Sequence, residues 1–362
     1  MIGALYFNLL SFLIIYFSKS INRLMGLFFS VFCIFIFLAI RYDYGNDYFS
    51  YLDQFYEIQR YSSFSISNFI IKGNEIGWVY LNYFFGPLGF FAMQIFLAAF
   101  SCFVLYRFIK NYVSPKYYWF AIFIYIFQPY HMLVLSSAMR QAVVVSLFLL
   151  AIDFLIKKQS IHYIVVVLLG SLFHSTAYFL LPLVFLSYFS IQLKFKYIVI
   201  IVVLFIGSFF FIGEIFSQGQ QFISLYFEKE YSGHINQSVE KSTIGLGFIL
   251  NFIIYIILFY CTQHQNYLGK VIFLNIVVIS FLIIPLTFSF PLISRLNFYF
   301  TPLLMVAYPI AFENIQKRTI RIGFIILISI STLYEFFSFF YSETWINHFF
   351  EYKTIFSAPN FL

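Results

Sequence analysis

Three arginines adjoin apolar stretches in which charged residues are otherwise scarce. Arg41 follows the stretch 24–40, Arg140 begins the stretch 138–156, and Arg295 precedes the stretch 296–312. A guanidinium group is permanently charged and binds phosphate oxygens through paired hydrogen bonds. Arg140 and Arg295 are also expected at helix N-termini, where free N–H groups favour an anion. The three arginines therefore predict a phosphate or pyrophosphate site, the alternative being that each side chain extends to lipid headgroups.

His174 lies near the middle of another apolar stretch, between Gly170 and Pro182. Two interpretations are open. The imidazole could pack in the protein interior with a hydrogen bond to a backbone carbonyl. It could instead line a pocket at a chain reversal, because irregular backbone at membrane depth must be buried in protein or line a cavity. His131, near the end of its own stretch, poses the same alternatives more weakly.

Carboxylates cluster after the first of these arginines. Asp43 and Asp47 are four residues apart, so they would share a face of a helix, but Gly45 between them makes a turn equally compatible. Glu75 follows in the same segment. A solvated loop face would explain all three, whereas a carboxylate beside a bound substrate could act as a general base. Asp53 and Glu57 repeat this spacing in the stretch 51–57, which has the pattern of an amphipathic helix at a membrane interface.

Composition indicates the elements that must position these residues. Of 362 residues, 62% are hydrophobic and 10% are charged, against roughly 25% charged in a soluble domain. Apolar stretches long enough to cross a bilayer follow one another along the chain, and their length favours helices over barrel strands. The basic residues lie in short loops, which argues against a nucleic-acid partner. The three cysteines have no metal-ligand spacing, so a disulfide framework or zinc site is not expected. The sequence also has no Gly-rich phosphate loop and no HExxH motif, so neither a metal nor a cofactor is expected.

We therefore predict an all-α, polytopic membrane protein whose residues 1–362 form a single integral membrane domain. About ten transmembrane helices are expected. They cover 2–18, 24–40, 88–109, 117–135, 138–156, 198–216, 244–262, 271–290, 296–312 and 322–341.

The stretch 163–189 decides the topology. As a re-entrant pair of half-helices it leaves thirteen basic residues in cytoplasmic loops and eight outside, whereas a single crossing gives eleven and ten. The positive-inside rule favours the re-entrant pair. Both termini then face outward, and the long segments 41–87 and 217–243 become external loops.

Four short motifs, in this order, resemble those of EpsG/Wzy-type bacterial polysaccharide polymerases. They are Arg41-Tyr-Asp-Tyr-Gly-Asn-Asp-Tyr-Phe-Ser-Tyr, Glu75-Ile-Gly-Trp-Val-Tyr-Leu-Asn, Met139-Arg-Gln followed by Phe173-His-Ser-Thr-Ala, and Arg295-Leu-Asn-Phe-Tyr-Phe. The resemblance implies a GT-C-like architecture. It also implies a metal-independent glycosyltransferase in the bacterial cytoplasmic membrane, with its active site facing the periplasm or exterior.

Such an enzyme would transfer a growing glycan from undecaprenyl pyrophosphate to the next lipid-linked oligosaccharide repeat unit. Its partners would be this donor and acceptor, the lipid bilayer and a chain-length regulator. Arg41, Arg140 and Arg295 would bind the pyrophosphate; His174, Asp47 or Glu75 would serve the acceptor hydroxyl; and Asp43 and Tyr299 would contact substrate.

Three other kinds of membrane protein fit the same composition. A flippase for lipid-linked glycans would need a cavity open to alternate sides, usually with repeated halves, and no internal repeat is visible. An O-antigen-ligase-like transferase shares the chemistry and differs only in its acceptor. A membrane acyltransferase would instead use acyl donors.

Overall fold

The computed structural model describes the chain except residues 19–20, 61–74, 209–244, 264, 288–290 and 358–362. The predicted external loop 217–243 and part of the predicted span 198–216 lie outside the described residues. The described residues are mostly helical. The long helices of the bundle are α1 (Ile2–Phe17), α2 (Arg23–Ala39), α6 (Phe90–Tyr112), α7 (Tyr118–Phe127), α9 (Met139–Ile156), α14 (Leu246–Cys261), α15 (Leu268–Thr287), α17 (Leu304–Asn314) and α18 (Arg318–Tyr341).

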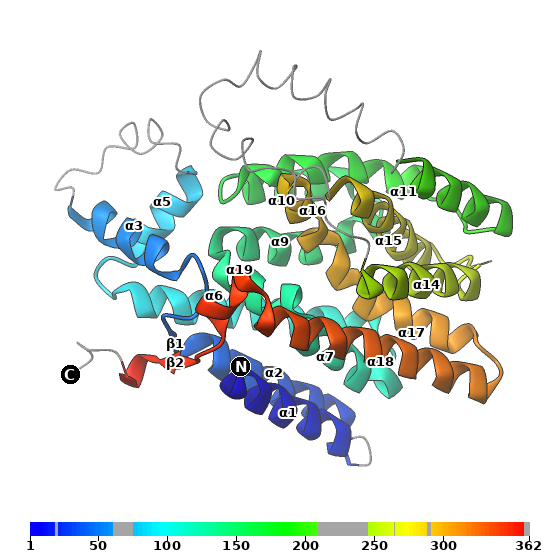
Figure 1. The fold of residues 1–362 in the computed structure, drawn as a ribbon. Helices are drawn as coiled ribbons and strands as arrows, with labels where there is room; N and C mark the ends of the chain where they lie inside the picture. The colour runs from blue at the N-terminus through cyan, green and yellow to red at the C-terminus, as the bar shows by residue number, and fades with distance from the viewer. Residues whose placement is uncertain (19–20, 61–74, 209–244, 264, 288–290, 358–362) are drawn as a thin grey trace.

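Smaller elements connect and cap the bundle. They are β1 (Arg41–Tyr42), α3 (Tyr48–Arg60), α5 (Ile76–Phe84), η2 (Pro115–Tyr117), η3 (Tyr130–Val134), α8 (Leu135–Ser137), α10 (Ser160–Ser171), η4 (Ser175–Phe185), α11 (Leu186–Phe189), α16 (Pro291–Phe300), η5 (Thr301–Leu303), α19 (Glu343–Phe349), β2 (Lys353–Thr354) and η6 (Ile355–Ser357). A further helix covers Phe195–Ser208. In Figure 1, the helices α3 and α5 and the two strands lie at the left-hand end of the bundle.

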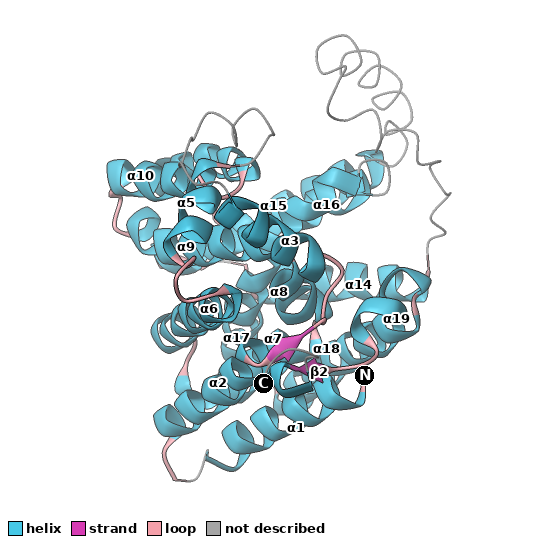
Figure 2. Ribbon diagram, turned by 90° about the vertical axis from the view of Figure 1, so that its left-hand side faces the viewer, coloured by secondary structure: helices cyan, strands magenta, loops and turns pink. Residues whose placement is uncertain are grey.

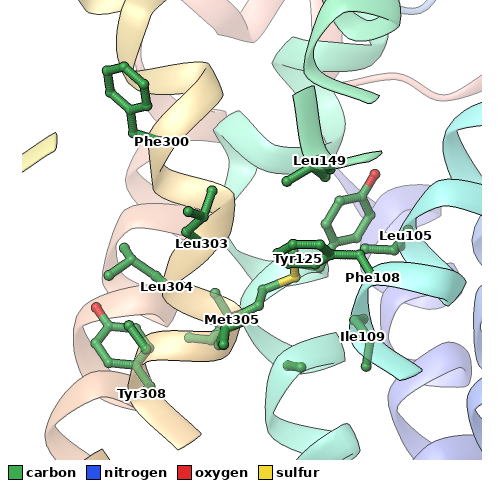
Figure 3. Packing of buried hydrophobic residues seen from close by; sticks show 14 of the residues in the cluster. Leu105, Phe108, Ile109, Tyr125, Leu149, Phe300, Leu303, Leu304, Met305 and Tyr308 are labelled. Atoms are coloured by element: carbon green, nitrogen blue, oxygen red, sulfur yellow. The ribbon is translucent and has the colours of Figure 1, made fainter. Parts of the chain in front are cut away.

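Large apolar side chains fill the space between the helices. Figure 3 shows part of this core, where α6 contributes Phe108 and α7 contributes Tyr125. Leu303 from η5 and Met305 from α17 pack in the same region. Other large apolar side chains, such as Phe28 on α2, remain exposed. A helix that satisfies its own backbone hydrogen bonds and presents apolar side chains outward is suited to lipid contact. The fold therefore agrees with an all-α membrane protein.

The described helices do not confirm the ten crossings expected. Four described helices are long and apolar enough to cross: α6, α9, α15 and α18. A fifth crossing is reached if the segments Pro115–Phe127 and Tyr130–Ser137, bent by 69°, form one span. The expected helices α1, α2 and α14 are present, but each has only 16 or 17 residues. The apolar stretches located these helices, whereas their lengths depend on where loops and caps interrupt them.

The stretch 163–189 folds as a hairpin. The Tyr163 hydroxyl in α10 donates a hydrogen bond to the Leu180 carbonyl in η4 at 2.7 Å, and the Ser160 and Tyr188 hydroxyls are 2.8 Å apart. In one continuous helix, residues 17 apart in sequence would be separated by about 25 Å. The chain therefore reverses, and His174, with extended backbone, lies at the reversal. Whether this hairpin re-enters a membrane stays a prediction.

The C-terminal segment holds the loop that follows β1. Strands β1 and β2 pair antiparallel, with Arg41 opposite Thr354, and Figure 2 shows them in magenta among the helices. The Gly45 N–H donates to the His348 carbonyl at 3.0 Å. The Tyr352 ring stacks on Phe37 with centroids 4.5 Å apart. These contacts set the position of residues 43–47, which lead into α3.

Opposite charges pair at the other end of the bundle. Arg107 forms an ion pair with Asp153 at 2.7 Å, and Glu313 pairs with Lys116 and Lys270 at 3.7 and 3.1 Å. These residues belong to the loop ends that the charge count assigns to the cytoplasm. The bundle thus has a basic end and, opposite it, the end at which Arg140 and His174 lie.

Candidate active site

Glu75 joins Arg140 to His174. Its Oε1 lies 3.1 Å from His174 Nδ1, and its Oε2 accepts a hydrogen bond from Arg140 Nη1. Glu75 immediately precedes α5, Arg140 lies in the first turn of α9, and His174 lies at the tip of the hairpin. Three segments distant in sequence therefore converge through one carboxylate.

The N-terminus of α5 is docked closely on the hairpin tip. The Gly77 N–H donates to the Leu172 carbonyl at 2.8 Å, and a Cβ at position 77 would come within 2.8 Å of that oxygen. Only glycine leaves room for this approach. The contact places Glu75, two residues earlier, beside His174.

The ionisation of Glu75 determines the roles of the two histidine nitrogens. Burial raises the pKa of the Glu75 carboxyl, but the hydrogen bond with His174 and the charge of Arg140 outweigh it, so the pKa lies below its usual value. An ionised carboxylate only accepts hydrogen bonds, so Nδ1–H of His174 is the donor. In the neutral imidazole, Nε2 then carries the lone pair, which is the form required of a general base.

Asp47 is held near the same arginines by a short network. Its N–H donates to Ser137 Oγ at 3.1 Å, the Ser137 hydroxyl donates to Asn46 Oδ1 at 2.8 Å, and Asn46 Nδ2 donates to Asp47 Oδ1 at 2.9 Å. Burial raises the pKa of the Asp47 carboxyl, against the opposing effects of Arg295, Arg140 and His348. Asp43 and Asp47 thus lie in a turn, not on one helix.

Arg295 is connected to the same region through its backbone. It lies in α16, and its carbonyl accepts a hydrogen bond from Gln141 Nε2, in the first turn of α9, at 2.7 Å. The Arg295 side chain is exposed. On the opposite flank, the Arg140 guanidinium carbon lies 5.8 Å from the centroid of the Tyr51 ring.

Four of the predicted site residues line one cavity of about 670 Å³. They are Asp47, Arg140, His174 and Arg295. This volume falls within the range of small-molecule sites, about 300–1,000 Å³. A pair of guanidinium groups, a histidine and a carboxylate thus face one space that could hold a charged group and a sugar.

Arg41 does not belong to this cavity. It is 4% exposed and lies among the tyrosines Tyr44, Tyr48 and Tyr352, and burial lowers its pKa to about 10. Its carbonyl accepts a hydrogen bond from Gln94 Nε2 at 2.9 Å. The three arginines therefore do not form a single cluster, because β1 turns the Arg41 side chain into the protein.

Three other predicted residues also lie behind the cavity surface or away from it. Glu75 contacts two cavity residues but does not line the cavity itself. Asp43 forms an ion pair with Lys353 at 2.9 Å. Tyr299 is fully buried, and its hydroxyl lies 2.6 Å from Thr176 Oγ1 in the hairpin.

Sequence reasoning missed one carboxylate in the cavity. Glu335 lies within α18 and lines the cavity together with Gln128 and Asn251. An acidic residue inside an apolar helix is a signal that could have identified it.

Among the described residues, no three side chains of His, Cys, Asp or Glu are grouped to hold a metal ion.

Comparisons with known proteins place the chain in one family. A search of curated proteins found no match, and neither did a search of solved structures. The family model described as the EpsG family matches residues 24–354, which include all four motifs and every residue of the cavity. The chain therefore belongs to the EpsG family, and with its apolar helices it is a membrane protein of polysaccharide biosynthesis.

Proposed function

We propose that this protein is a polysaccharide polymerase of the bacterial cytoplasmic membrane. It transfers a growing glycan from undecaprenyl pyrophosphate to a hydroxyl of the next lipid-linked repeat unit, at the outer face. The observation that carries this proposal is the shared cavity of Arg140, Arg295, His174 and Asp47 in a member of the EpsG family. Donor and acceptor are both lipid-linked, which agrees with a site at one end of a membrane bundle.

The reaction exchanges one C–O bond for another. The acceptor oxygen attacks the anomeric carbon of the donor, the bond from that carbon to the pyrophosphate breaks, and the pyrophosphate leaves with the electron pair. Guanidinium groups placed where this negative charge develops lower the barrier. Arg140 and Arg295 are the two cavity residues suited to that role.

The acceptor hydroxyl must lose its proton as the new bond forms. We assign this proton to His174 Nε2, because Glu75 accepts the hydrogen bond from Nδ1–H and so holds the imidazole in the required tautomer. Asp47 lines the same cavity and is the alternative acceptor of the proton. Arg41 is proposed to organise the loop of Asp43 and Asp47 through its buried position.

Orientation of the site follows from the charge distribution. The cavity lies at the end of the bundle opposite the ion pairs of Arg107, Lys116 and Lys270. Basic loops are retained on the cytoplasmic side. We therefore assign the cavity to the external side, where chain growth would meet the lipid-linked repeat units and a chain-length regulator.

Reconstituted protein supplied with lipid-linked repeat units tests this proposal. Arg140→Ala and Arg295→Ala should each lower the polymerisation rate at least tenfold, equivalent to about 1.4 kcal/mol of transition-state stabilisation. Arg318→Ala, at the opposite end of the bundle, is the matched control and should retain the rate. Full activity of both cavity variants would refute the proposed role of these arginines in stabilising the leaving pyrophosphate.

A deletion strain gives an independent readout. Loss of a polymerase should leave one repeat unit per carrier at the outer face in place of long chains. Accumulation of single units on the cytoplasmic side would instead indicate a flippase. In the reconstituted system, normal polymerisation by His174→Ala would show that His174 is not the proton acceptor, and this role would then be assigned to Asp47.

A further inference from the structure

A second polar cluster lines the same cavity, formed by Glu335, Gln128 and Asn251. Glu335 Oε2 accepts a hydrogen bond from Gln128 Nε2, and Oε1 accepts one from Asn251 Nδ2. The three side chains come from α18, the end of α7 and α14. Ser331, one turn before Glu335, donates to Asn251 Oδ1 at 3.2 Å. Three helices thus converge on one carboxylate.

Glu335 lies inside the helix, not at its end. Tyr341, the last residue of α18, is six positions further along the chain, which corresponds to about 9 Å along the axis. A carboxylate at such depth is energetically costly, and residues of this kind usually have a function. None of the ion pairs found among the described residues includes Glu335, so no protein cation offsets its charge there.

The cluster has unused hydrogen-bond acceptors. An ionised carboxylate offers about four acceptor positions, of which the two amides occupy two. Gln128 Oε1 is buried and has no hydrogen-bond partner in the described residues. A ligand that fits must therefore bring donors, and an anion would be repelled.

Aromatic rings line the cavity as well. Tyr130 and Phe298 have near-parallel rings with centroids 6.2 Å apart, and Trp345 from α19 stacks on Phe339 with centroids 5.4 Å apart. Tyr130, Phe298 and Trp345 all line the cavity. Sugars combine an apolar C–H face, which packs on aromatic rings, with a rim of hydroxyl donors. A metal cation would need more oxygen ligands than one carboxylate and one amide oxygen supply.

We propose that Glu335, Gln128 and Asn251 form a sugar-binding subsite that accepts hydroxyl hydrogen bonds from one ring of the lipid-linked repeat unit. This inference rests on the proposed function, because the cavity must then hold a sugar joined to a pyrophosphate. The guanidinium groups bind the pyrophosphate and the Glu335 cluster binds the sugar, so opposite charges in one cavity orient the substrate. The cluster thus contributes to selection of the repeat unit.

The test separates sugar binding from pyrophosphate binding in the full-length protein. The probes are the oligosaccharide repeat unit released from the producing bacterium's polysaccharide, without lipid or phosphate, and sugar-free undecaprenyl pyrophosphate. Binding of each is followed by titration calorimetry. Glu335→Gln should weaken binding of the oligosaccharide at least tenfold and leave binding of the pyrophosphate within twofold. Arg140→Ala should do the reverse.

Two further variants keep the test decisive. Asn251→Ala removes one amide and leaves the carboxylate, and it should weaken oligosaccharide binding in the same direction if Glu335→Gln fails to fold. Glu313→Gln alters a carboxylate paired with Lys116 and Lys270 at the opposite end, and should change neither affinity. In polymerisation assays, Glu335→Gln should raise KM for lipid-linked units at least tenfold with kcat within threefold.

Failure of this inference differs from failure of the proposed function. Unchanged oligosaccharide affinity in Glu335→Gln and Asn251→Ala would overturn the subsite even if the protein polymerises. A protein that binds the oligosaccharide through Glu335 but does not polymerise would refute the polymerase and retain the subsite. If Glu335→Gln abolished a dependence of activity on sodium or a divalent cation without changing sugar binding, the cluster would be a cation site and not a sugar subsite.

Discussion

The Glu75 carboxylate and the His174 imidazole, 99 residues apart in sequence, meet at 3.1 Å between Oε1 and Nδ1. The same carboxylate binds Arg140 through its other oxygen. Glu75 does not line the cavity, whereas its two partners do. We therefore propose Glu75 as a positioning residue, which holds the tautomer of His174 and the direction of the Arg140 guanidinium.

Removal of the Glu75 charge should impair transfer without unfolding the protein. Glu75→Gln keeps the shape of the side chain but leaves Arg140 without its counter-charge, and breaking one side of a partly buried pair is costly. We expect kcat to fall at least tenfold, equivalent to about 1.4 kcal/mol, with a smaller change in KM. Single-turnover rates measure this. Asp53→Asn, an exposed carboxylate on α3, is the control, and an equal loss there would contradict the assignment.

Asp47 should limit stability as pH rises. Its folded-state pKa lies above the usual value near 3.8 because burial disfavours the charged form. The folded state therefore binds this proton more tightly than the unfolded state, and stability falls as pH rises from the unfolded pKa through the raised folded pKa. Asp47→Asn removes this loss, so at pH 7 we expect a higher Tm, by on the order of 1–3 °C.

Thermal unfolding in detergent at pH 4 and pH 7 checks this expectation. The gain should be smaller at the lower pH, where more of the native carboxyl is protonated. Polymerisation by the same variant should decrease if Asp47 accepts the proton, and should persist if His174 does. A lower Tm of Asp47→Asn at pH 7 would show that the charge itself is stabilising.

Gly45→Ala should displace the Asp47 loop. Gly45 has φ +119°, a conformation that other residues rarely adopt, and a Cβ there would meet Ser137 Oγ at 2.7 Å and Ser137 Cα at 3.3 Å. Ser137 is also the residue that accepts the Asp47 N–H. We expect destabilisation of about 1–3 kcal/mol and a loss of polymerisation. Gly89→Ala is the matched control, since φ is also positive there but no atom lies within 4 Å; equal effects on activity would contradict the loop argument.

Tyr163→Phe should weaken the hairpin. The change removes the hydrogen bond to the Leu180 carbonyl, at a cost of about 1 kcal/mol. Tyr178→Phe, on the other arm, alters an exposed hydroxyl and should cost little. Thermal unfolding compares the two variants. Equal stability of both would mean that the two arms do not depend on this contact.

Much of the helical framework could be predicted from the sequence. The stretches 24–40, 88–109, 138–156 and 322–341 correspond closely to α2, α6, α9 and α18, because continuous apolar patterns permit few other structures. The reversal at His174 was also foreseen, from the polar residues that interrupt an apolar stretch and from the distribution of basic loops. Composition alone does not fix the number of crossings, because helices of 16 residues and bent segments differ little in composition from full spans.

For the candidate site, the sequence identified some of the residues and the tertiary structure decided the others. Chemical types and their order along the chain were sufficient to single out Arg140, Arg295, His174 and Asp47 as candidates that line one cavity. Three outcomes depended on the tertiary structure. Arg41 points into a buried cluster of tyrosines, and Glu75 contacts two cavity residues without lining the cavity. Glu335 in α18 lines the cavity. Pairing of a side chain depends on the rotation of its helix and on which distant helix lies beside it. The sequence indicates the rotation of a helix only weakly, and it does not indicate which distant helix lies beside it. Composition therefore determined the class of protein, whereas packing decided which polar groups line the same cavity.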